Sequence, residues 1–152
     1  MSYRTIEDAW PPRNTAERAI FTASRQTAAR VWNDLVRRHH RLRRLGWLWP
    51  ARARWRRWAK GRYPGLSAES AQRLIGEFYE AVDSCRQLRR NGQAVMRYPW
   101  RLRRCRDVIY TNQDARICDG RLILPHGASG TLRIRLPHSI TLLGLLVEAR
   151  FS

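Results

Sequence analysis

Three acidic residues at helical spacing form the one cluster of carboxylates in this sequence that could act together: Glu77, Glu80 and Asp83. Cleavage of a phosphodiester by two metal ions needs carboxylates that converge on ions about 3.5–4 Å apart. Arg73 and Arg86 lie on the same helical stretch, so the pattern favours ion pairs along a helix surface over a magnesium site. We therefore expect no catalytic residue in this chain, and no enzymatic activity by the chain alone.

The histidines and cysteines do not match a known metal-binding or nucleophilic motif. The sequence has no H-E-x-x-H, no G-x-S-x-G and no phosphate-binding loop, and its cysteines form no C-x-x-C pair. Neighbouring helical residues do not share a face, so His39 and His40 are expected to be solvated or to face phosphates. We expect no metal and no cofactor in this chain. The cysteines are expected to be reduced and buried: Cys85, Cys105 and Cys118.

Positive charge dominates the composition of the 152 residues. Thirty Lys and Arg stand against twelve Asp and Glu, which gives a net charge of +18. Nearly all the basic residues are Arg, which binds phosphate bidentately and stacks on bases, so the partner is expected to be nucleic acid. An anionic membrane surface is the alternative, but no segment approaches the roughly 20 apolar residues of a membrane-spanning helix. We expect no membrane partner and a cytoplasmic, nucleoid-associated protein.

Two long helices are predicted from their caps and apolar periodicity. Asn14, with Glu17 three residues later, predicts a helix from Ala16 to about Leu45. Ser67 caps a second helix that should end near Asn91, where Gly92 follows. The apolar stripes of the two helices are expected to pack together.

Tryptophan and arginine alternate between these helices, in "LGWLWPARARWRRWAKGRYPG". This pattern is typical of phosphate neutralisation combined with base stacking, which contributes about 1–3 kcal/mol per base. A helix with its tryptophans in the core and its arginines in solvent is equally compatible with the pattern. We expect the following residues, here and in the flanking arginine clusters, to contact nucleic-acid backbones or to stack on bases: Arg37, Arg41, Arg44, Arg52, Arg54, Trp55, Arg56, Arg57, Lys60, Arg62, Arg101, Arg103 and Arg104.

Strand patterns occupy both ends of the chain. Tyr3 to Ala9 can form a short strand, which Pro11 and Pro12 end. After the arginine cluster several short alternating segments follow, and Asp119-Gly120 between two of them is a strong hairpin signal. The expected fold class is α+β, a small β-barrel interrupted by an inserted α-helical bundle. Residues 1–12 would give the first strand, 13–97 the helices and 98–152 the rest of the barrel.

Four stretches, taken in order, resemble the N-terminal half of TnpB, the transposon-encoded RNA-guided nuclease related to type V CRISPR effectors: "AWPPRNTAERAIFTASRQTAARVWNDLV", "YPGLSAESAQRLIGEFYEAVDSCRQL", "YPW" before an arginine cluster, and "YTNQDARICDGRLILPHGASGTLRIRLP". The resemblance implies an OB-like wedge domain interrupted by a helical recognition domain. In that family this lobe grips the guide RNA scaffold and the guide–target heteroduplex, largely through backbone geometry and charge.

The same resemblance implies positions that read a short motif beside the target in duplex DNA. The matching residues are Gln72, early in the second helix, and Thr111, followed by Asn112. The alternative is that Gln72 is a solvent-facing helix residue and Thr111 a strand former. Ala68 and Glu69 replace a Lys and an aromatic residue of some family members, which leaves the motif sequence open.

The RuvC nuclease domain of that family, with its magnesium-binding carboxylates and zinc ribbon, has no counterpart in this sequence. Three explanations stay open: the nuclease half lies on another chain, the sequence is a fragment, or the protein binds nucleic acid and has lost the nuclease. Magnesium and zinc would belong to a RuvC-containing chain or segment, which we expect as a partner beside guide RNA and target double-stranded DNA. The expected function is the guide-RNA-binding and target-DNA-recognition lobe of a TnpB-like or type V effector. The alternative is a stand-alone basic DNA- or RNA-binding regulatory protein without guide RNA.

Overall fold

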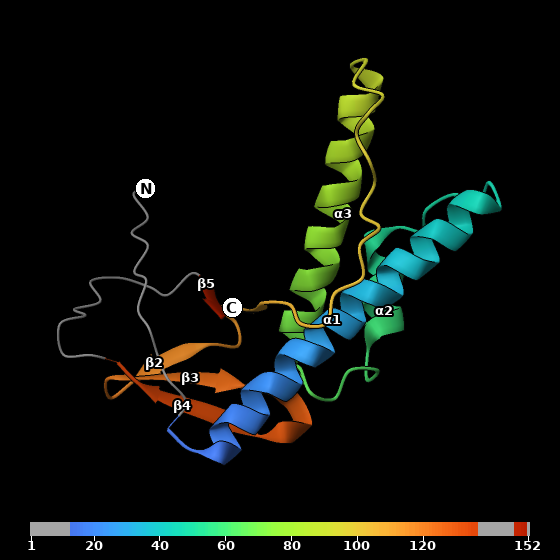
Figure 1. Ribbon diagram of the computed structural model, residues 1–152. Coiled ribbons are helices and arrows are strands. Elements are labelled where there is room, and N and C mark those ends of the chain that lie inside the picture. Colours follow the sequence, from blue (N-terminus) through green and yellow to red (C-terminus); the bar gives the residue numbers. More distant parts are fainter. Residues whose placement is uncertain (1–12, 137–147, 152) are drawn as a thin grey trace.

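The computed structural model describes residues 13–136 and 148–151 and places three helices before a set of short strands (Figure 1). The helices are α1 (Thr15–Arg44), α2 (Arg52–Ala59) and α3 (Ala68–Arg90). The strands are β1 (Val108–Thr111), β2 (Arg116–Cys118), β3 (Arg121–Pro125), β4 (Thr131–Arg135) and β5 (Glu148–Phe151), with a 3₁₀ turn at Gly127–Ser129. The fold class is α+β, as the sequence predicts.

Both long helices begin at the caps that the sequence predicts. The side chain of Asn14 accepts a hydrogen bond from the backbone N–H of Glu17 (2.9 Å), and the Glu17 carboxylate accepts one from the N–H of Arg13 (2.8 Å). Ser67 accepts from the N–H of Ser70 (3.0 Å) at the start of α3. These bonds satisfy amide groups that a helix leaves free in its first turn, so the local sequence fixes where each helix starts.

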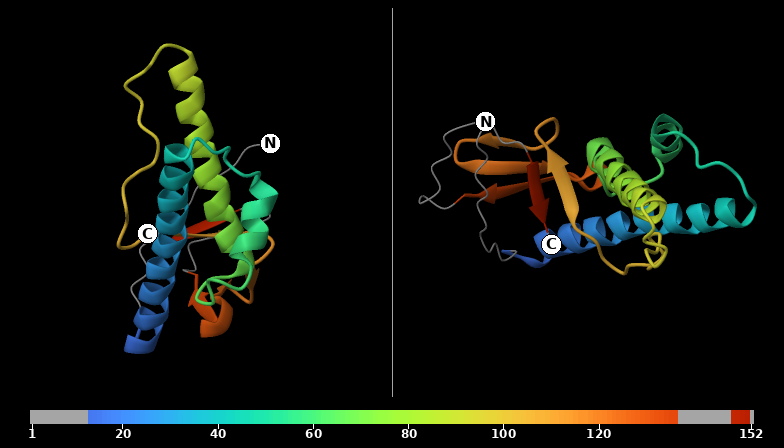
Figure 2. Two further views of the ribbon diagram at one scale, coloured as in Figure 1. Left: turned by 90° about the vertical axis from the view of Figure 1, so that its right-hand side faces the viewer. Right: turned by 90° about the horizontal axis from the view of Figure 1, so that it is seen from above.

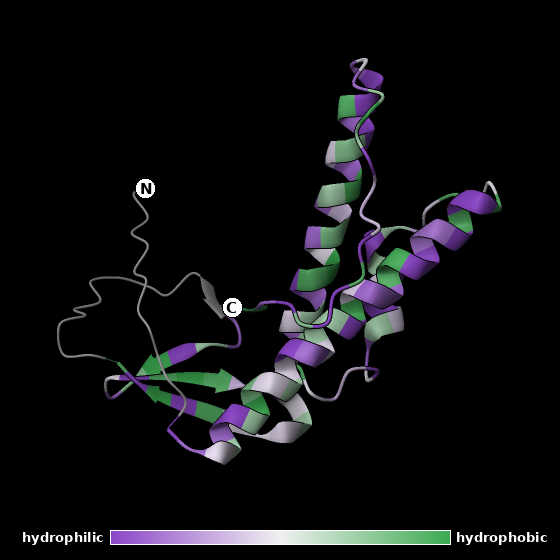
Figure 3. Ribbon diagram, in the orientation of Figure 1, coloured by the Kyte–Doolittle hydropathy of each residue, from purple (hydrophilic) through white to green (hydrophobic). Residues whose placement is uncertain are grey.

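The three helices bury a shared apolar layer. Figure 1 shows α1 and α3 diverging from the end of the molecule that carries the strands, and Figure 3 shows hydrophobic and hydrophilic residues alternating along both helices. On α3 the stripe of fully buried side chains consists of Leu74, Ile75, Phe78 and Val82, and Val31 and Leu35 of α1 are buried to the same degree. Helical periodicity therefore predicts the packing faces correctly.

The hairpin predicted at Asp119-Gly120 is present. Strands β2 and β3 pair antiparallel with Cys118 opposite Arg121. Asp119 (φ 49°) and Gly120 (φ 67°) both occupy the left-handed region, which is the conformation of the tight turns that match strand twist. Strand β4 then pairs antiparallel with β3, Leu122 lying opposite Ile134.

The described strands form two open sheets and do not close into a barrel. One sheet pairs β1 with β5, and the other has the order β2-β3-β4. The chain leaves the first sheet at a turn in which the C=O of Thr111 accepts from the N–H groups of Asp114 (3.2 Å) and Ala115 (2.9 Å). The predicted first strand, Tyr3 to Ala9, and most of the segment between β4 and β5 lie outside the described residues.

Helices and strands share one core. Leu122, Leu124 and Leu132 belong to the same apolar cluster as Leu35 and Phe78. At the start of α3 the Ser70 hydroxyl donates to the C=O of Ile109 in β1 (2.7 Å), which ties the helix to the first sheet. The regions 13–97 and 98–152, predicted as separate domains, are thus packed against each other within the residues that the structure describes.

A second set of hydrogen bonds connects α1, the loop before α3 and the turn after β3. The Ser24 hydroxyl lies 2.5 Å from Nδ1 of buried His126, and the N–H of Ala128 donates to the C=O of Pro64 (2.7 Å). Gly127 has φ +55°, and a Cβ there would lie 2.4 Å from the Pro64 oxygen and 2.5 Å from that of Leu66. Backbone stands on both sides, so this close approach needs glycine.

We predict that Gly127→Ala destabilises the protein more than Gly46→Ala, by about 1–3 kcal/mol. Both glycines have a left-handed φ, which costs an alanine about 1–2 kcal/mol. A Cβ at Gly46 (φ +65°) meets nothing within 4 Å, so that variant measures the backbone term alone. Urea denaturation of the two variants and the parent gives the comparison. Equal losses would show that the turn can move away from residues 64–66.

Candidate nucleic-acid interface

Most of the predicted cations, though not Arg101, Arg103 and Arg104, lie in a part of the chain that contains no acidic residue. No Asp or Glu occurs between Asp34 and Glu69, a span that holds these eleven cations: Arg37, Arg38, Arg41, Arg43, Arg44, Arg52, Arg54, Arg56, Arg57, Lys60 and Arg62. All of them are exposed, as are Arg101, Arg103 and Arg104. Arg37 pairs with Asp34 at the boundary of the span (3.5 Å). The span therefore presents a strongly positive surface.

These cations lie on α1, on and just after α2, and on the extended chain between α3 and β1. Arg30, Arg37, Arg41 and Arg44 repeat at spacings of seven, four and three residues, which places them on one helix face, while Val31 and Leu35 are buried on another. Figure 2 shows α2 and the extended chain between α3 and β1 on opposite sides of the α1–α3 pair. We call these residues, from α1, α2 and Arg101–Arg104, the cationic face.

Trp55 does not have the role that the sequence predicts for it. It is 4 % exposed, and its ring lies 4.8 Å from that of Trp49 and 5.1 Å from that of Trp58. A short helix must bury one face to be stable, and in α2 that face is the large indole of Trp55. The prediction that Trp55 stacks on bases is therefore wrong for this structure, and the alternative of a tryptophan core is correct for this residue.

His39 also differs from its expected place. It is 1 % exposed and packs among the rings of Trp49, Phe78 and Tyr98, whereas His40 is exposed. Burial, followed by the nearby charge of Arg43, lowers the pKa of His39 to about 4. Burial likewise lowers the pKa of His126 to about 4. Both rings are neutral at physiological pH, so they add no positive charge to the surface.

Glu77, Glu80 and Asp83 of α3 form ion pairs, as predicted, and do not converge on a common point. The pairs are Glu77 with Arg106 (2.9 Å), Glu80 with Arg73 (3.6 Å) and Asp83 with Arg86 (3.3 Å). Within residues 13–136 and 148–151 no three His, Cys, Asp or Glu side chains are grouped so as to hold a metal ion.

Two of the three cysteines are more exposed than predicted. All three are free thiols, and Cys85 is buried, but Cys105 and Cys118 are exposed. Cys118 lies on β2, an edge strand of its sheet whose three residues are all exposed. Cys105 lies in the extended chain between α3 and β1.

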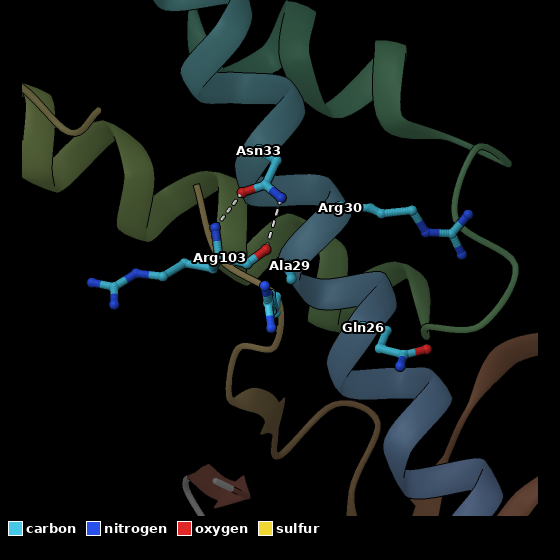
Figure 4. A pocket seen from close by; sticks show the side chains of 6 residues that line it. Gln26, Ala29, Arg30, Asn33 and Arg103 are labelled. Atoms are coloured by element: carbon cyan, nitrogen blue, oxygen red, sulfur yellow. Dashed lines mark hydrogen bonds between the residues drawn. The ribbon is translucent and has the colours of Figure 1, made fainter. Parts of the chain in front are cut away.

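The extended chain from residue 94 to residue 107, here called the return segment, carries the third group of cations. The Asn33 side chain donates to the C=O of Arg103 (2.9 Å) and accepts from its N–H (2.8 Å), as Figure 4 shows. This clip holds Arg103 and Arg104 beside Arg30 and Gln26 around an open hollow. Asn33 and Arg103 are 70 residues apart, and the sequence gives no signal for their contact.

Arg106 fixes the other end of the return segment. Its guanidinium lies 3.7 Å from the ring centroid of Trp32 and donates to Glu77 (2.9 Å), and its N–H donates to the C=O of Arg25 (3.2 Å). A partly buried guanidinium with both an aromatic and a carboxylate partner is held more firmly than a surface ion pair. Arg106 is thus a positioning residue that sequence reasoning did not single out.

The two predicted motif-reading positions lie on adjoining elements. Ser67, the cap of α3, hydrogen-bonds to the carboxylate of Asp114, which also accepts from the N–H of Thr111 (3.0 Å). Gln72 is half-buried one turn into α3, and Asn112 is exposed. The Thr111 hydroxyl accepts from the N–H of Gln113 (3.3 Å), so it also stabilises the local turn. The first turns of α3 and the end of β1 are therefore held together.

Comparisons with known proteins do not add to this description of the cationic face. Comparison with protein-family models, curated proteins and solved structures gave no match. No helix in the described ranges has the length and apolar character needed to cross a bilayer. The functional proposal therefore depends on the residues and geometry of the cationic face.

We predict that the protein loses stability as the pH falls from 6.5 towards 4. In this range the unfolded histidines bind protons, while His39 and His126 stay neutral in the fold, so the free energy of unfolding decreases, by up to about 3 kcal/mol for each. Urea denaturation between about pH 5 and pH 7, where carboxylates remain ionised, measures the slope.

His39→Gln should flatten this slope, and His40→Gln is the matched control because His40 is exposed. An unchanged slope in His39→Gln, or an equal change in both variants, would contradict the assignment.

Proposed function

We propose that this chain is the guide-RNA-binding and target-DNA-recognition lobe of a TnpB-like or type V RNA-guided effector. The observation that carries the proposal is the exposed run of eleven cations with no acidic residue between Asp34 and Glu69. Such a surface gains affinity by releasing counterions from phosphates and does not depend on base sequence. It suits a protein that leaves sequence reading to base pairing.

The dimensions of α1 support contact with several phosphates at once. A helix rises about 1.5 Å per residue, so the stripe from Arg30 to Arg44 spans about 21 Å. Duplex DNA carries one charge per roughly 1.7 Å of its axis, and many of these charges therefore fall within reach of the stripe and its flanks. Guanidinium groups bind phosphate oxygens bidentately, which adds orientation to the attraction.

The strands would form the wedge domain of this lobe. We propose an OB-like barrel that includes the two described sheets and segments outside the described residues. The joint between Ser67 and Asp114 places the start of α3 beside the end of β1, which suits a shared site for a motif in duplex DNA. In this proposal Gln72, Thr111 and Asn112 read that motif.

Cleavage would require a RuvC-containing chain or segment with its own magnesium and zinc. The carboxylates of α3 pair with arginines and do not converge on a metal, which supports a binding role for this chain. The place of action would be the cytoplasm, at the nucleoid. The alternative, a regulatory protein that binds DNA or RNA without a guide, uses the same cationic face and differs in the nucleic acid that it carries.

We predict that structured RNA binds with a steep salt dependence, because log K falls by about 0.7–0.9 per log unit of salt for each neutralised phosphate. Replacing Arg54, Arg56 and Arg57 by Ala should reduce this slope by about 2–3 units. The matched control replaces three exposed arginines of the second sheet: Arg116, Arg121 and Arg133. Fluorescence anisotropy titrations over a series of salt concentrations measure both. An equal reduction in the control would remove the assignment to α2.

The nucleic acid that copurifies with the protein separates the two functions. After a low-salt purification, a discrete structured RNA on a sequencing gel is expected for the guide-binding lobe. Heterogeneous nucleic acid that is released by moderate salt would favour the regulatory protein instead.

For motif reading we predict that Gln72→Ala or Thr111→Ala weakens binding to target DNA beside its preferred motif by about 1–3 kcal/mol, with RNA affinity unchanged. Glu80→Gln, on an exposed part of the same helix, is the control for Gln72. Competition between duplexes of randomised flanking sequence measures the preference. If both variants keep the preference of the parent, these residues do not read the motif.

A further inference from the structure

A second hollow lies at the far end of the return segment, between the diverging C-terminal parts of α1 and α3. Its polar and aromatic lining comes from three elements: His40, Arg43, Arg89, Arg97, Tyr98 and Trp100. No acidic residue occurs between Asp83 and Asp107, so the return segment carries only positive charge up to its last residue, Asp107. The hollow is therefore suited to an anionic ligand.

Tyr98 organises the cations of this hollow. The guanidinium of Arg43 lies 4.1 Å from its ring centroid and that of Arg89 lies 5.4 Å away, so cations from α1 and α3 meet at one ring. The ring of Tyr98 in turn lies 5.1 Å from that of buried His39. The aromatic core thus supports a pair of guanidiniums at the surface.

Trp100 differs from the tryptophans of α2 because it lies outside the core. It is 50 % exposed, and the guanidinium of Arg101 lies 5.6 Å from its ring centroid. Leu102 and Met96 beside it in sequence are also exposed. A solvent-exposed indole can stack on a base, and the neighbouring arginines can bind its phosphate.

The same segment leads from this hollow to the one beside Asn33. Tyr98 and Trp100 precede Arg103 and Arg104, whose position is fixed by the Asn33 clip (Figure 4). The return segment therefore presents, in order, a pair of stacked guanidiniums, an exposed indole and a second group of guanidiniums. Residues of the return segment line both hollows.

We infer that the return segment is a binding track for an unpaired stretch of nucleic acid, with a base stacked on Trp100 and phosphates at Arg43, Arg89, Arg103 and Arg104. The inference rests on the proposed function, since it assigns the single-stranded part of the nucleic acid to one site on this protein. A base inside a duplex already has neighbours on both faces, so stacking on Trp100 along a strand requires unpaired bases. The stripe on α1, which offers only charge, has no such requirement.

The test compares Trp100→Ala with Trp47→Ala, which removes an indole that is 65 % exposed in the loop between α1 and α2. The probes are labelled single-stranded RNA and DNA of about 12 nucleotides and a blunt duplex of the same sequence. Trp100→Ala should weaken binding of at least one single strand by about 5- to 100-fold and leave duplex binding unchanged. Trp47→Ala should bind all three probes as the parent does.

Three further measurements separate stacking from charge and from misfolding. Trp100→Ala removes no charge, so the slope of log K against log salt should stay as in the parent. Trp100→Phe keeps a flat ring and should restore most of the affinity. Circular dichroism checks that all variants are folded.

The inference is wrong if Trp100→Ala binds both single strands as the parent does, or if it loses duplex binding to the same extent. An equal loss in Trp47→Ala would also overturn it, because any exposed indole would then suffice. These outcomes differ from a failure of the proposed function, in which the parent binds none of the probes at physiological salt. A loss confined to RNA or to DNA supports the track and identifies the strand that it holds.

Discussion

Burial of one face of α3 is the interaction on which the rest of this molecule depends. Leu74, Ile75, Phe78 and Val82 are fully buried, and α3 contacts α1, α2 and β1. Each such side chain contributes about 1.5–3 kcal/mol on burial. A net charge of +18 opposes compaction through self-repulsion, so this apolar layer has to outweigh it. The fold meets the constraint by placing the helices around α3 and the guanidinium groups outside them.

The arginines at the surface pack directly on the aromatic rings of the core. Arg38 lies over Trp58 at 4.5 Å and Arg106 over Trp32 at 3.7 Å, so arginines cover faces of rings that belong to the core or pack against it. Trp32 and Trp55 are buried, and Trp49 and Trp58 pack against the core. Few tryptophans near the helices are therefore open to a ligand. The exposed aromatic groups are accordingly found in loops and in the return segment, where no helix face has to be buried.

Local signals in the sequence predict the elements better than they predict the site. The caps at Asn14 and Ser67 and the turn at Asp119-Gly120 are decided by neighbouring residues, and the structure contains all three. The pattern predicts base stacking for Trp55, which is buried, because alternation of Trp and Arg does not show which indoles face the core. The Asn33 clip and the division of the strands into two sheets depend on residues far apart in the chain, for which one sequence carries no signal. The arginines were predicted as exposed cations because charge and burial are incompatible for most of them.

We expect the clip between Asn33 and Arg103 to form late in folding. Its partners are 70 residues apart, and closing so long a loop costs more chain entropy than forming either helix from local contacts. The helices α1 and α3 can therefore form and pair first, and the return segment docks onto an existing surface. During synthesis the cations of α1 and α2 leave the ribosome before residue 94 does, so a nascent chain acquires its charge before it acquires the grooves that the return segment completes.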